Sequence, residues 1–250
     1  MPVTFIDPLD EDLFRKEVKI YRIYTLDRLL EMFQQEKFTF LSPSKWKDPY
    51  EKRFLTLNIT DNEQQMLIPT VPQGDPLNYN LYAQCWTGLQ ESEAFWRVRS
   101  PNNDGINITV KTNDLYHFLD ARPENIYIGK VKYLSLTKIF DPNEIRNELL
   151  LSGGDNLLFH LRLLLRKRRA YRYEKEYRIF LLSDQATIAE VYDILNFNPC
   201  QIIYRLMLHP DMGEHLVTLL TNYFNGHCIN NIRINKSNFS APVPPINLTI

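Results

Sequence analysis

The hydrophobic period of the chain changes repeatedly over short distances, and this constrains the fold more than any other feature of the sequence. Residues 18–24 form a short apolar run typical of a strand, residues 26–35 repeat leucine and phenylalanine at helical spacing, and residues 37–41 alternate like a strand. Thr25 precedes the helical run and is a suitable N-cap. The same exchange continues to residue 234, which predicts an α+β fold: a single mixed domain, residues 1–250, of short strands and helices.

The remaining periodic segments are all short. Further strands are predicted at 81–87, 106–110, 126–134, 177–182, 201–208 and 228–234, and further helices at 91–99, 142–151, 156–169, 186–195 and 212–224. Residues 61–80 contain three prolines and a glycine without clear periodicity, so we expect a loop-rich excursion there.

Glycine is scarce, and this excludes two common nucleotide-binding motifs. The chain has 8 glycines in 250 residues, well below the usual level of about 7%. No three of them are spaced to cradle a phosphate, so neither a dinucleotide-binding fingerprint nor a P-loop is present. The formal charge of -1, from 29 basic and 30 acidic residues, gives no overall attraction to nucleic acid or membrane, so any polyanion site must be a local patch.

The three cysteines, Cys85, Cys200 and Cys228, lie far apart and form no C-x-x-C pair. We therefore expect neither a disulfide framework nor a thiolate zinc site, and interpret each as a small buried apolar group. The five histidines show no metal-ligand spacing, so no metal is predicted. The first residues lack the basic and apolar regions of an export signal, and no apolar stretch is long enough to span a membrane. These features predict a cytoplasmic protein.

The most informative local motif is the segment 171–182, which alternates charged and aromatic residues. If it is extended throughout, its period of two places Arg172, Glu174, Glu176 and Arg178 on one face. One interpretation is an edge strand that is protected by charge. The other is functional: one glutamate acts on a substrate while the arginines tune its pKa and bind phosphate.

Three other features have both a structural and a functional interpretation. Arg22 lies in the middle of a predicted strand, where a charge indicates either a pocket floor or an ion pair. Trp86 is by default a core residue, and stacking on a planar ligand is the less common role. The basic run 166–169 is typical of a helix C-terminus, yet it directly precedes the Glu-x-Glu segment, so a contact with a polyanion is also considered.

Taken in order, these segments resemble a known family. The motifs are YR at 21–22, SPSxWxDPYE at 42–51, QCWT at 84–87, ESxAFWR at 91–97 and YEKEYR at 173–178. Over residues 20–210 they are similar to a widespread bacterial family known only as a domain of unknown function. That family commonly has a tyrosine where this chain has Arg99.

The order of elements is also similar to that of ADP-ribosyltransferases, in particular the DarT-like toxins that modify nucleic acid. This resemblance rests on Arg22, on Trp86-Thr87 and on Glu174-x-Glu176, although no Ser-Thr-Ser follows an aromatic residue in the middle strand. It implies a split sheet and NAD as the substrate, with no metal. Cleavage of the nicotinamide–ribose bond passes through an oxocarbenium-like state that a nearby carboxylate stabilises.

The resemblance implies a role for each candidate residue. Glu176 is the catalytic carboxylate, and Glu174 orients the acceptor. Arg22 holds the diphosphate, and the rest of the NAD site is expected to comprise Tyr24, Ser42, Trp86 and Thr87. With a nucleic-acid acceptor, RNA being favoured, the phosphate contacts are expected from Arg166, Lys167, Arg168, Arg169 and Arg172.

A toxin-like effector of phage defence, paired with an antitoxin protein, is the cellular role that the resemblance implies. Two alternatives remain open on the sequence. One is a non-catalytic module that binds nucleic acid or protein. The other is a metal-independent nuclease that uses Glu174 and Glu176 as acid and base.

Overall fold

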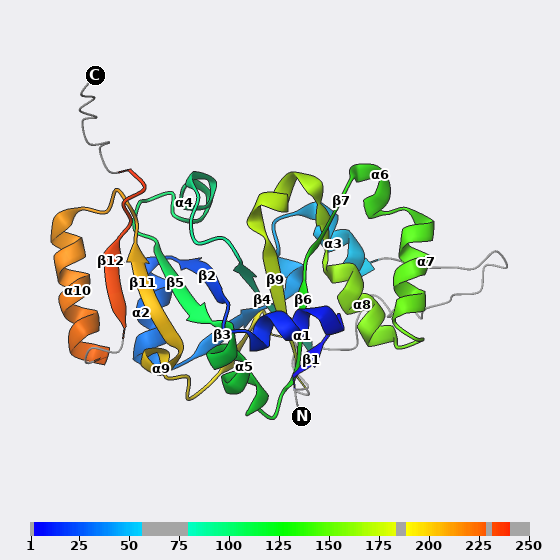
Figure 1. Ribbon diagram of the computed structural model, residues 1–250, viewed down its shortest axis with the longest axis horizontal. Helices are drawn as coiled ribbons and strands as arrows, with labels where there is room; N and C mark the ends of the chain where they lie inside the picture. The colour runs from blue at the N-terminus through cyan, green and yellow to red at the C-terminus, as the bar shows by residue number, and fades with distance from the viewer. Residues whose placement is uncertain (1–2, 57–79, 184–188, 229–231, 241–250) are drawn as a thin grey trace, which may run out of the picture.

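The chain folds around one open mixed sheet with helices on both faces, so the predicted α+β fold is confirmed (Figure 1). The computed structural model describes residues 3–56, 80–183, 189–228 and 232–240. Eight strands of the main sheet follow the order β1-β6-β9-β4-β2-β5-β11-β12, while β3 pairs with β4 and with β10. The main-sheet strands are β1 (Thr4–Phe5), β2 (Lys19–Tyr24), β3 (Phe38–Leu41), β4 (Asn80–Thr87), β5 (Ile106–Lys111), β6 (Asn125–Lys130), β9 (Glu176–Ser183), β10 (Val191–Ile194), β11 (Ile203–Leu208) and β12 (Arg233–Lys236).

Two further strands, β7 and β8, form a separate parallel pair. Their bounds are β7 (Lys132–Leu134) and β8 (Arg166–Arg168). The helices are α1 (Pro8–Arg15), α2 (Leu26–Gln35), α3 (Pro49–Arg53), α4 (Glu93–Arg99), α5 (Thr112–Asp120), α6 (Leu136–Ile139), α7 (Pro142–Leu151), α8 (Asn156–Leu164), α9 (Pro199–Ile202) and α10 (Glu214–Cys228). Three 3-10 turns complete the described elements: η1 (Pro43–Lys45), η2 (Phe54–Thr56) and η3 (Arg169–Glu174).

Strand β9 shows why the core has two halves. Its residues are all buried and alternate between two hydrophobic clusters. Ile179 and Leu181 face the cluster formed with α2, α5 and α10, whereas Phe180 and Leu182 face the one formed with α7 and α8. A strand covered on both faces carries a continuous apolar run, which is the pattern at 177–182.

The sheet is nearly divided between β2 and β4. In the described ranges, Tyr21 and Thr87 are the one pair of residues that face each other across these two strands. By contrast, β4 pairs with β9 along its whole length, from Asn80 opposite Ser183 to Thr87 opposite Glu176. The junction of β2 and β4 is therefore where the sheet is least tightly joined.

Two predicted helices are wrong in whole or in part. The helix expected at 156–169 ends at Leu164, because the chain then turns and residues 166–168 pair with β7 as strand β8. The segment 186–195 was expected to be helical, but its described residues contain strand β10, in which Tyr192 lies opposite Phe40 of β3. In both segments, pairing with a distant strand overrides the local period. The excursion predicted at 61–80 lies outside the described residues apart from residue 80.

The expectation of no disulfide is also wrong, because Cys200 and Cys228 are bonded to each other. Cys200 lies on α9 and Cys228 ends α10, and the fold brings their Cα atoms to 5.3 Å. That distance is in the normal range for a disulfide. A separation of 28 residues carries no local signal in the sequence, so only the packing reveals the bond. Cys85 is a free thiol, as expected.

Candidate functional site

The Glu-x-Glu segment lies in a buried cluster of five charged side chains. Glu176 begins β9, is 4% exposed, and accepts hydrogen bonds from Lys167 at 2.7 Å and Arg178 at 2.8 Å. Lys167 also lies 2.5 Å from Glu174, and Arg178 lies 2.6 Å from Glu51. We call these five residues the buried charge cluster: Glu51, Lys167, Glu174, Glu176 and Arg178.

The two glutamates differ in electrostatic environment. Burial raises the pKa of both carboxyl groups, but for Glu176 the adjacent Arg178 and Lys167 outweigh burial and hold its pKa below the usual range. For Glu174 burial dominates over the attraction of Lys167, and the negative charge of Glu176 adds to it, so the pKa of Glu174 is raised. The cluster holds three carboxylates against two cations, which agrees with one carboxyl group being easier to protonate than the other.

Three local structures bring these side chains together. The pairing of β7 with β8 places Lys167 opposite Tyr133, whose hydroxyl accepts the backbone N–H of Glu176 at 2.8 Å. Residues 169–174 form the turn η3 rather than a strand, and Lys175 follows in the left-handed conformation with φ of 45°. Glu174 and Glu176 therefore meet because both bind Lys167, not because they share the face of one strand as predicted.

The loop at 42–51 supplies contacts that the sequence analysis did not assign. The Arg178 guanidinium lies 4.1 Å from the centre of the Trp46 ring, a cation–π contact. Asp48 caps α3 by accepting the backbone N–H of Tyr50 and also accepts from Arg168 at 3.1 Å. Glu51 follows on α3. The motif SPSxWxDPYE could have indicated these residues from the sequence. Its Trp46 and Glu51 contact Arg178, and its Asp48 contacts Arg168.

Arg22 and Glu176 both reach Cys85 on the strand between them. The guanidinium of Arg22 donates to the carbonyl oxygen of Cys85 at 3.3 Å, across the junction of β2 and β4. Burial, together with the carboxylate of Glu176 that is hydrogen-bonded to the thiol, raises the pKa of the Cys85 thiol to about 12. Arg22 and Cys85 are partly exposed although they lie on central strands. Arg22 on β2 and Glu176 on β9 therefore reach Cys85 from the two neighbouring strands of β4, one at its carbonyl and the other at its thiol.

Tyr24, Thr87 and Ser42 are also partly exposed, but they do not form one group. The Tyr24 ring lies 4.9 Å from the Arg22 guanidinium, and its buried hydroxyl has no hydrogen-bond partner among the described residues. The Thr87 hydroxyl donates to the backbone carbonyl of Glu174, which ties β4 to η3. Ser42 caps η1 and lies 2.8 Å from Ser44, oxygen to oxygen, with no described contact to the cluster.

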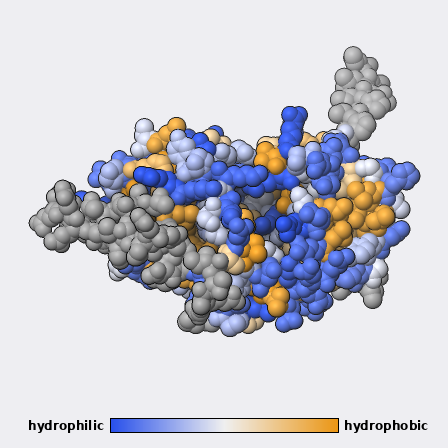
Figure 2. Space-filling view, turned by 180° about the vertical axis from the view of Figure 1, so that it is seen from behind, coloured by the Kyte–Doolittle hydropathy of each residue, from blue (hydrophilic) through white to orange (hydrophobic). Residues whose placement is uncertain are grey.

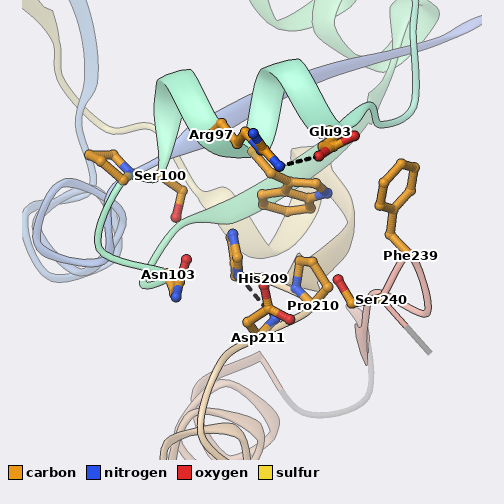
Figure 3. Close-up of a pocket in the computed structure, with 11 residues that line it drawn as sticks. Glu93, Arg97, Ser100, Asn103, His209, Pro210, Asp211, Phe239 and Ser240 are labelled. Atoms are coloured by element: carbon orange, nitrogen blue, oxygen red, sulfur yellow. Dashed lines mark hydrogen bonds and ion pairs between the residues drawn. The ribbon is translucent and has the colours of Figure 1, made fainter. Parts of the chain in front are cut away.

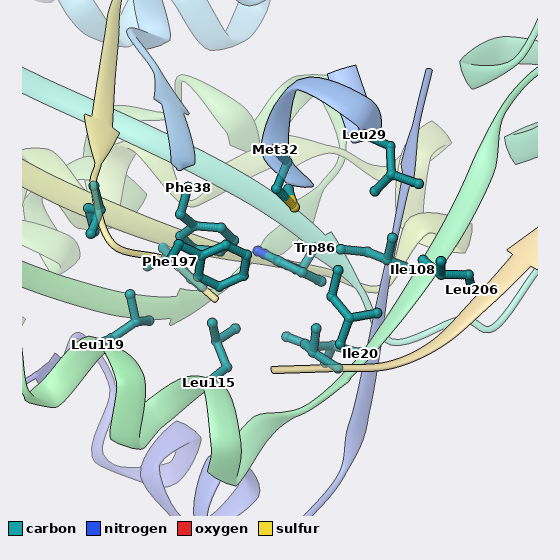
Figure 4. Packing of buried hydrophobic residues seen from close by; sticks show 14 of the residues in the cluster. Ile20, Leu29, Met32, Phe38, Trp86, Ile108, Leu115, Leu119, Phe197 and Leu206 are labelled. Atoms are coloured by element: carbon teal, nitrogen blue, oxygen red, sulfur yellow. The ribbon is translucent and has the colours of Figure 1, made fainter. Parts of the chain in front are cut away.

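Trp86 is a core residue in this structure. Its side chain is 1% exposed and its indole nitrogen donates to Gln84 at 3.0 Å. Figure 4 shows it surrounded by apolar side chains such as Phe38, Ile108 and Met32. In this conformation neither face of the ring is available to a planar ligand, which agrees with the structural interpretation of this residue.

The basic run is divided between the interior and the surface. Arg166 is 1% exposed and donates to backbone carbonyls, among them those of residues 138 and 139 at 2.6 and 3.1 Å. Lys167 belongs to the buried charge cluster, and Arg168 is held between Asp48 and the ring of Tyr171. Of the five predicted phosphate contacts, Arg169 and Arg172 are exposed.

The two most pronounced cavities on the described part of the chain are not lined by Arg22, Glu174 or Glu176. The space-filling view from behind shows a hollow near the middle of the molecule with hydrophilic residues around it (Figure 2). Within the described ranges, no three His, Cys, Asp or Glu side chains are grouped so that they could hold a metal ion. The helices in those ranges are each too short or too polar to cross a lipid bilayer.

Comparisons with known proteins give structural matches alone. No protein-family model matches the chain, and no curated protein matches it. Among solved structures, the chain is similar to Thermus sp. 2.9 DarT in complex with ADP-ribosylated ssDNA, with a TM-score of 0.41 and 9% identity over 89% of this chain and 95% of that chain. The same enzyme in complex with NAD+ gives a TM-score of 0.37 and 9% identity over 89% and 96%. TM-scores below 0.5 do not by themselves establish a common fold.

Proposed function

We propose that the protein is an ADP-ribosyltransferase that consumes NAD and modifies nucleic acid, RNA in the first instance. The single observation that supports it most is the meeting of Arg22 and Glu176 at Cys85. These residues are 154 positions apart in the sequence, and both contact Cys85 on β4, Arg22 from β2 and Glu176 from β9. A guanidinium for the diphosphate and a carboxylate for the ribose are the two charges that the reaction requires.

The electrostatics of Glu176 fit this role. A carboxylate that stabilises an oxocarbenium-like ribose must be ionised at neutral pH, and Arg178 and Lys167 hold the pKa of Glu176 below its usual range. In the proposed reaction the bond from ribose C1′ to nicotinamide breaks, and nicotinamide leaves with the electron pair. An oxygen or nitrogen of the acceptor then bonds to C1′ and loses its proton to Glu174, whose raised pKa suits a proton acceptor.

Tyr24 supports the NAD site beside Arg22. Its hydroxyl is buried and lacks a hydrogen-bond partner in the described part of the chain, and such a group is normally satisfied by water or by a ligand. Its ring already contacts the Arg22 guanidinium at 4.9 Å. Together they offer a cation, an aromatic surface and a free hydroxyl. We propose Thr87 and Ser42 as peripheral contacts, and Trp86 as a support for β4.

The nucleic-acid contacts are proposed for the exposed cations of η3 and of Lys175, which directly follows it. Arg169, Arg172 and Lys175 are all exposed, and Tyr173 beside them is 41% exposed. Three phosphate contacts and one ring on which a base can stack are a suitable arrangement for a single strand. The Arg99 cation on α4 also acts on Glu174, where it lowers the pKa against the larger effect of burial.

The cellular role that we propose is a cytoplasmic toxin-like effector in phage defence or in a toxin-antitoxin pair. NAD and RNA are both available in the cytoplasm, which supports this compartment. The Cys200–Cys228 disulfide is unusual in a reducing compartment. Mass spectrometry of protein alkylated inside cells distinguishes the disulfide-bonded form of Cys200 and Cys228 from the reduced form.

The test is transfer of label from NAD. The purified protein is incubated with adenylate-labelled NAD and with RNA, single-stranded DNA or cell protein, and both labelled acceptor and free nicotinamide are measured. We expect labelling of RNA that Glu176→Gln and Arg22→Gln each reduce by at least a hundredfold. Glu11→Gln is the matched control, since this exposed glutamate of α1 pairs with Arg15 on the surface.

Loss of a buried ion pair in Glu176→Gln can reduce stability as well as activity. Arg22→Gln should cost less stability, because the contacts of this side chain with described residues are one hydrogen bond, at 3.3 Å, to a backbone carbonyl and the ring of Tyr24. Unfolding of each variant is followed in urea. Full labelling by folded Arg22→Gln and Glu176→Gln would reject the assigned roles, and absence of nicotinamide release from the wild type would reject the activity.

A non-catalytic nucleic-acid-binding module is the second candidate. It is favoured by the pairing of Glu176, whose two carboxylate oxygens are each bound to a buried cation. A structural ion pair requires no substrate. This function predicts binding of single-stranded RNA without nicotinamide release, with affinity falling steeply as salt rises. Cleavage of RNA without NAD would instead support the nuclease hypothesis.

A further inference from the structure

A cavity of about 590 Å³ lies outside the candidate site, between α4, the turn after β11 and the segment after β12 (Figure 3). None of the predicted catalytic, NAD-binding or phosphate-binding residues lines it. Its size lies within the range of small-molecule sites, roughly 300–1,000 Å³. The chemistry of its walls identifies the class of ligand.

His209 is the central polar group of the cavity. It is 3% exposed, and its Nδ1 accepts the backbone N–H of Asp211 at 3.0 Å, the contact dashed in Figure 3. A nitrogen that accepts carries no proton, so the neutral ring has its proton on Nε2. Burial lowers the pKa of His209 and so favours this neutral form. His209 lines the cavity, and no hydrogen bond from Nε2 to another described residue is found, so this donor is available to a ligand.

Aromatic rings provide the apolar walls. Trp96 is 2% exposed and contacts His209 edge to face, with ring centres 5.0 Å apart. Its indole nitrogen donates to Glu91 at 3.2 Å, which fixes the ring. Phe239 lies at another side of the cavity in Figure 3 and is 49% exposed, so its ring has a free face. A planar ligand can stack on Phe239 while its edge meets His209.

The rim of the cavity carries polar and charged groups that are free to bind. Asn103 and Asp211 are exposed and offer an amide and a carboxylate. Arg97 is 78% exposed, and its described partner is Glu93 at 2.5 Å, one turn earlier on α4. Such exposed pairs are worth less than about 1 kcal/mol, so this guanidinium can exchange its partner for a phosphate.

We propose that this cavity binds a nucleotide, with the base between Phe239 and His209 and the phosphate on Arg97. A nucleobase combines an apolar ring face with donors and acceptors along its edge, and this is the combination that the walls and rim present. A sugar lacks the ring face, and an aliphatic ligand would leave the His209 donor unpaired. The nucleotide can be free or part of a single strand, and the experiment separates these two sources.

The experiment measures binding by calorimetry, without NAD, so its outcome does not depend on catalysis. The probes are the four nucleoside 5′-monophosphates, ribose 5-phosphate, and oligonucleotides of six residues. We expect saturable binding of at least one monophosphate. The affinity for ribose 5-phosphate should be lower by a factor of about ten or more. An oligonucleotide that binds more tightly than the monophosphate assigns the site to nucleic acid, and equal affinity assigns it to the free nucleotide.

Substitutions at exposed residues keep the test independent of folding. Phe239→Ser and Arg97→Gln should each weaken binding by about tenfold, and His209→Leu should do so if urea unfolding shows that it is folded. Arg15→Gln is the matched control, because Arg15 forms the same kind of surface pair with Glu11 at 2.6 Å on α1. Unchanged affinity in Phe239→Ser and Arg97→Gln overturns the proposal. So does the absence of binding at millimolar nucleotide, or equal binding of ribose 5-phosphate.

The proposed transferase activity is tested separately. Glu176→Gln does not touch this cavity, so it should bind nucleotide as the wild type does. If that variant binds nucleotide but the wild type releases no nicotinamide, the cavity assignment stands and the transferase proposal fails. If the wild type labels RNA but binds no monophosphate, the transferase proposal stands and the cavity assignment fails.

Discussion

Removing the ammonium group of Lys167 should destabilise the protein strongly. Its ammonium group lies 2.5 Å from Glu174, 2.7 Å from Glu176 and 3.5 Å from Glu51, and the residue is 6% exposed. Lys167→Met keeps the apolar stem but removes the charge. The cluster then holds three carboxylates against one guanidinium, that of Arg178, in a region that water does not reach.

The expected cost follows from the burial of the partners. Removing one member of a buried ion pair leaves its partner charged and unpaired, which costs roughly 3–5 kcal/mol. Total stabilities are about 5–15 kcal/mol, so the loss is a large fraction of the whole. For a urea slope of about 3 kcal/mol/M, the loss lowers the midpoint of unfolding by about 1–1.7 M.

The assay is urea unfolding followed by tryptophan fluorescence. Arg169→Met is the matched control, because this neighbouring cation is exposed and should change stability by less than about 0.5 kcal/mol. Adding Glu174→Gln to Lys167→Met should restore part of the loss, because it removes one of the unpaired carboxylates. A loss below about 1 kcal/mol in Lys167→Met would show that water screens the cluster, and the reasoning about burial would be refuted.

The pH dependence follows from the same contacts. Because the pKa of folded Glu176 is held below its unfolded value near 4.5, its contribution to stability is present above that value. The contribution is lost as pH falls towards the lowered folded pKa. In Lys167→Met the folded pKa of Glu176 lies closer to its unfolded value, so the variant, although less stable at neutral pH, should lose less further stability than the wild type as pH falls below about 4.5.

Three further outcomes are expected. Reduction of the Cys200–Cys228 disulfide should lower the free energy of unfolding by about 3 kcal/mol, measured in urea with and without dithiothreitol, given the 28-residue separation; no change would mean that the bond is absent in solution. Gly105→Ala should destabilise by about 1–3 kcal/mol, because the new Cβ would lie 2.5 Å from a neighbouring Cβ, whereas Gly226→Ala in α10 has open space and should be neutral or stabilising. Because the folded pKa of His209 is lowered from its unfolded value near 6.5, this residue contributes stability above that value, and the contribution is lost as pH falls. The free energy of unfolding of His209→Gln should therefore decrease less than that of the wild type between about pH 6.5 and 5. Parallel plots of this free energy against pH for the two proteins would contradict the prediction.

Local patterns in the sequence predicted several elements with nearly correct ends. The helix at 26–35 matches α2, and the predicted strand at 81–87 matches β4, which begins at residue 80. Ser92 lies at the start of the helix predicted at 91–99, and it caps α4 by accepting the N–H of Phe95. Such features depend on period, caps and turn residues within a few positions, so a single sequence contains them.

Pairings between distant segments were not predicted. Residues 166–169 have a helical neighbourhood, and it is β7 that converts Arg166–Arg168 into a strand and buries Lys167. The contacts of Glu51 and Trp46 with Arg178 likewise join positions more than 120 residues apart. A motif identified these residues as notable, but their partners could not be read from it.

The residues that carry charge, and the order in which they occur, were determined by the sequence alone. It supplied Arg22 on an early strand, Glu174 and Glu176 on either side of one residue, and a basic run before them. The tertiary structure decided which of these charges are buried and which are exposed, and it placed the cavity around His209 between elements that the sequence did not connect. The physical reason is that solvent exposure and charge pairing depend on what packs over a side chain, and that cover comes from residues far away along the chain.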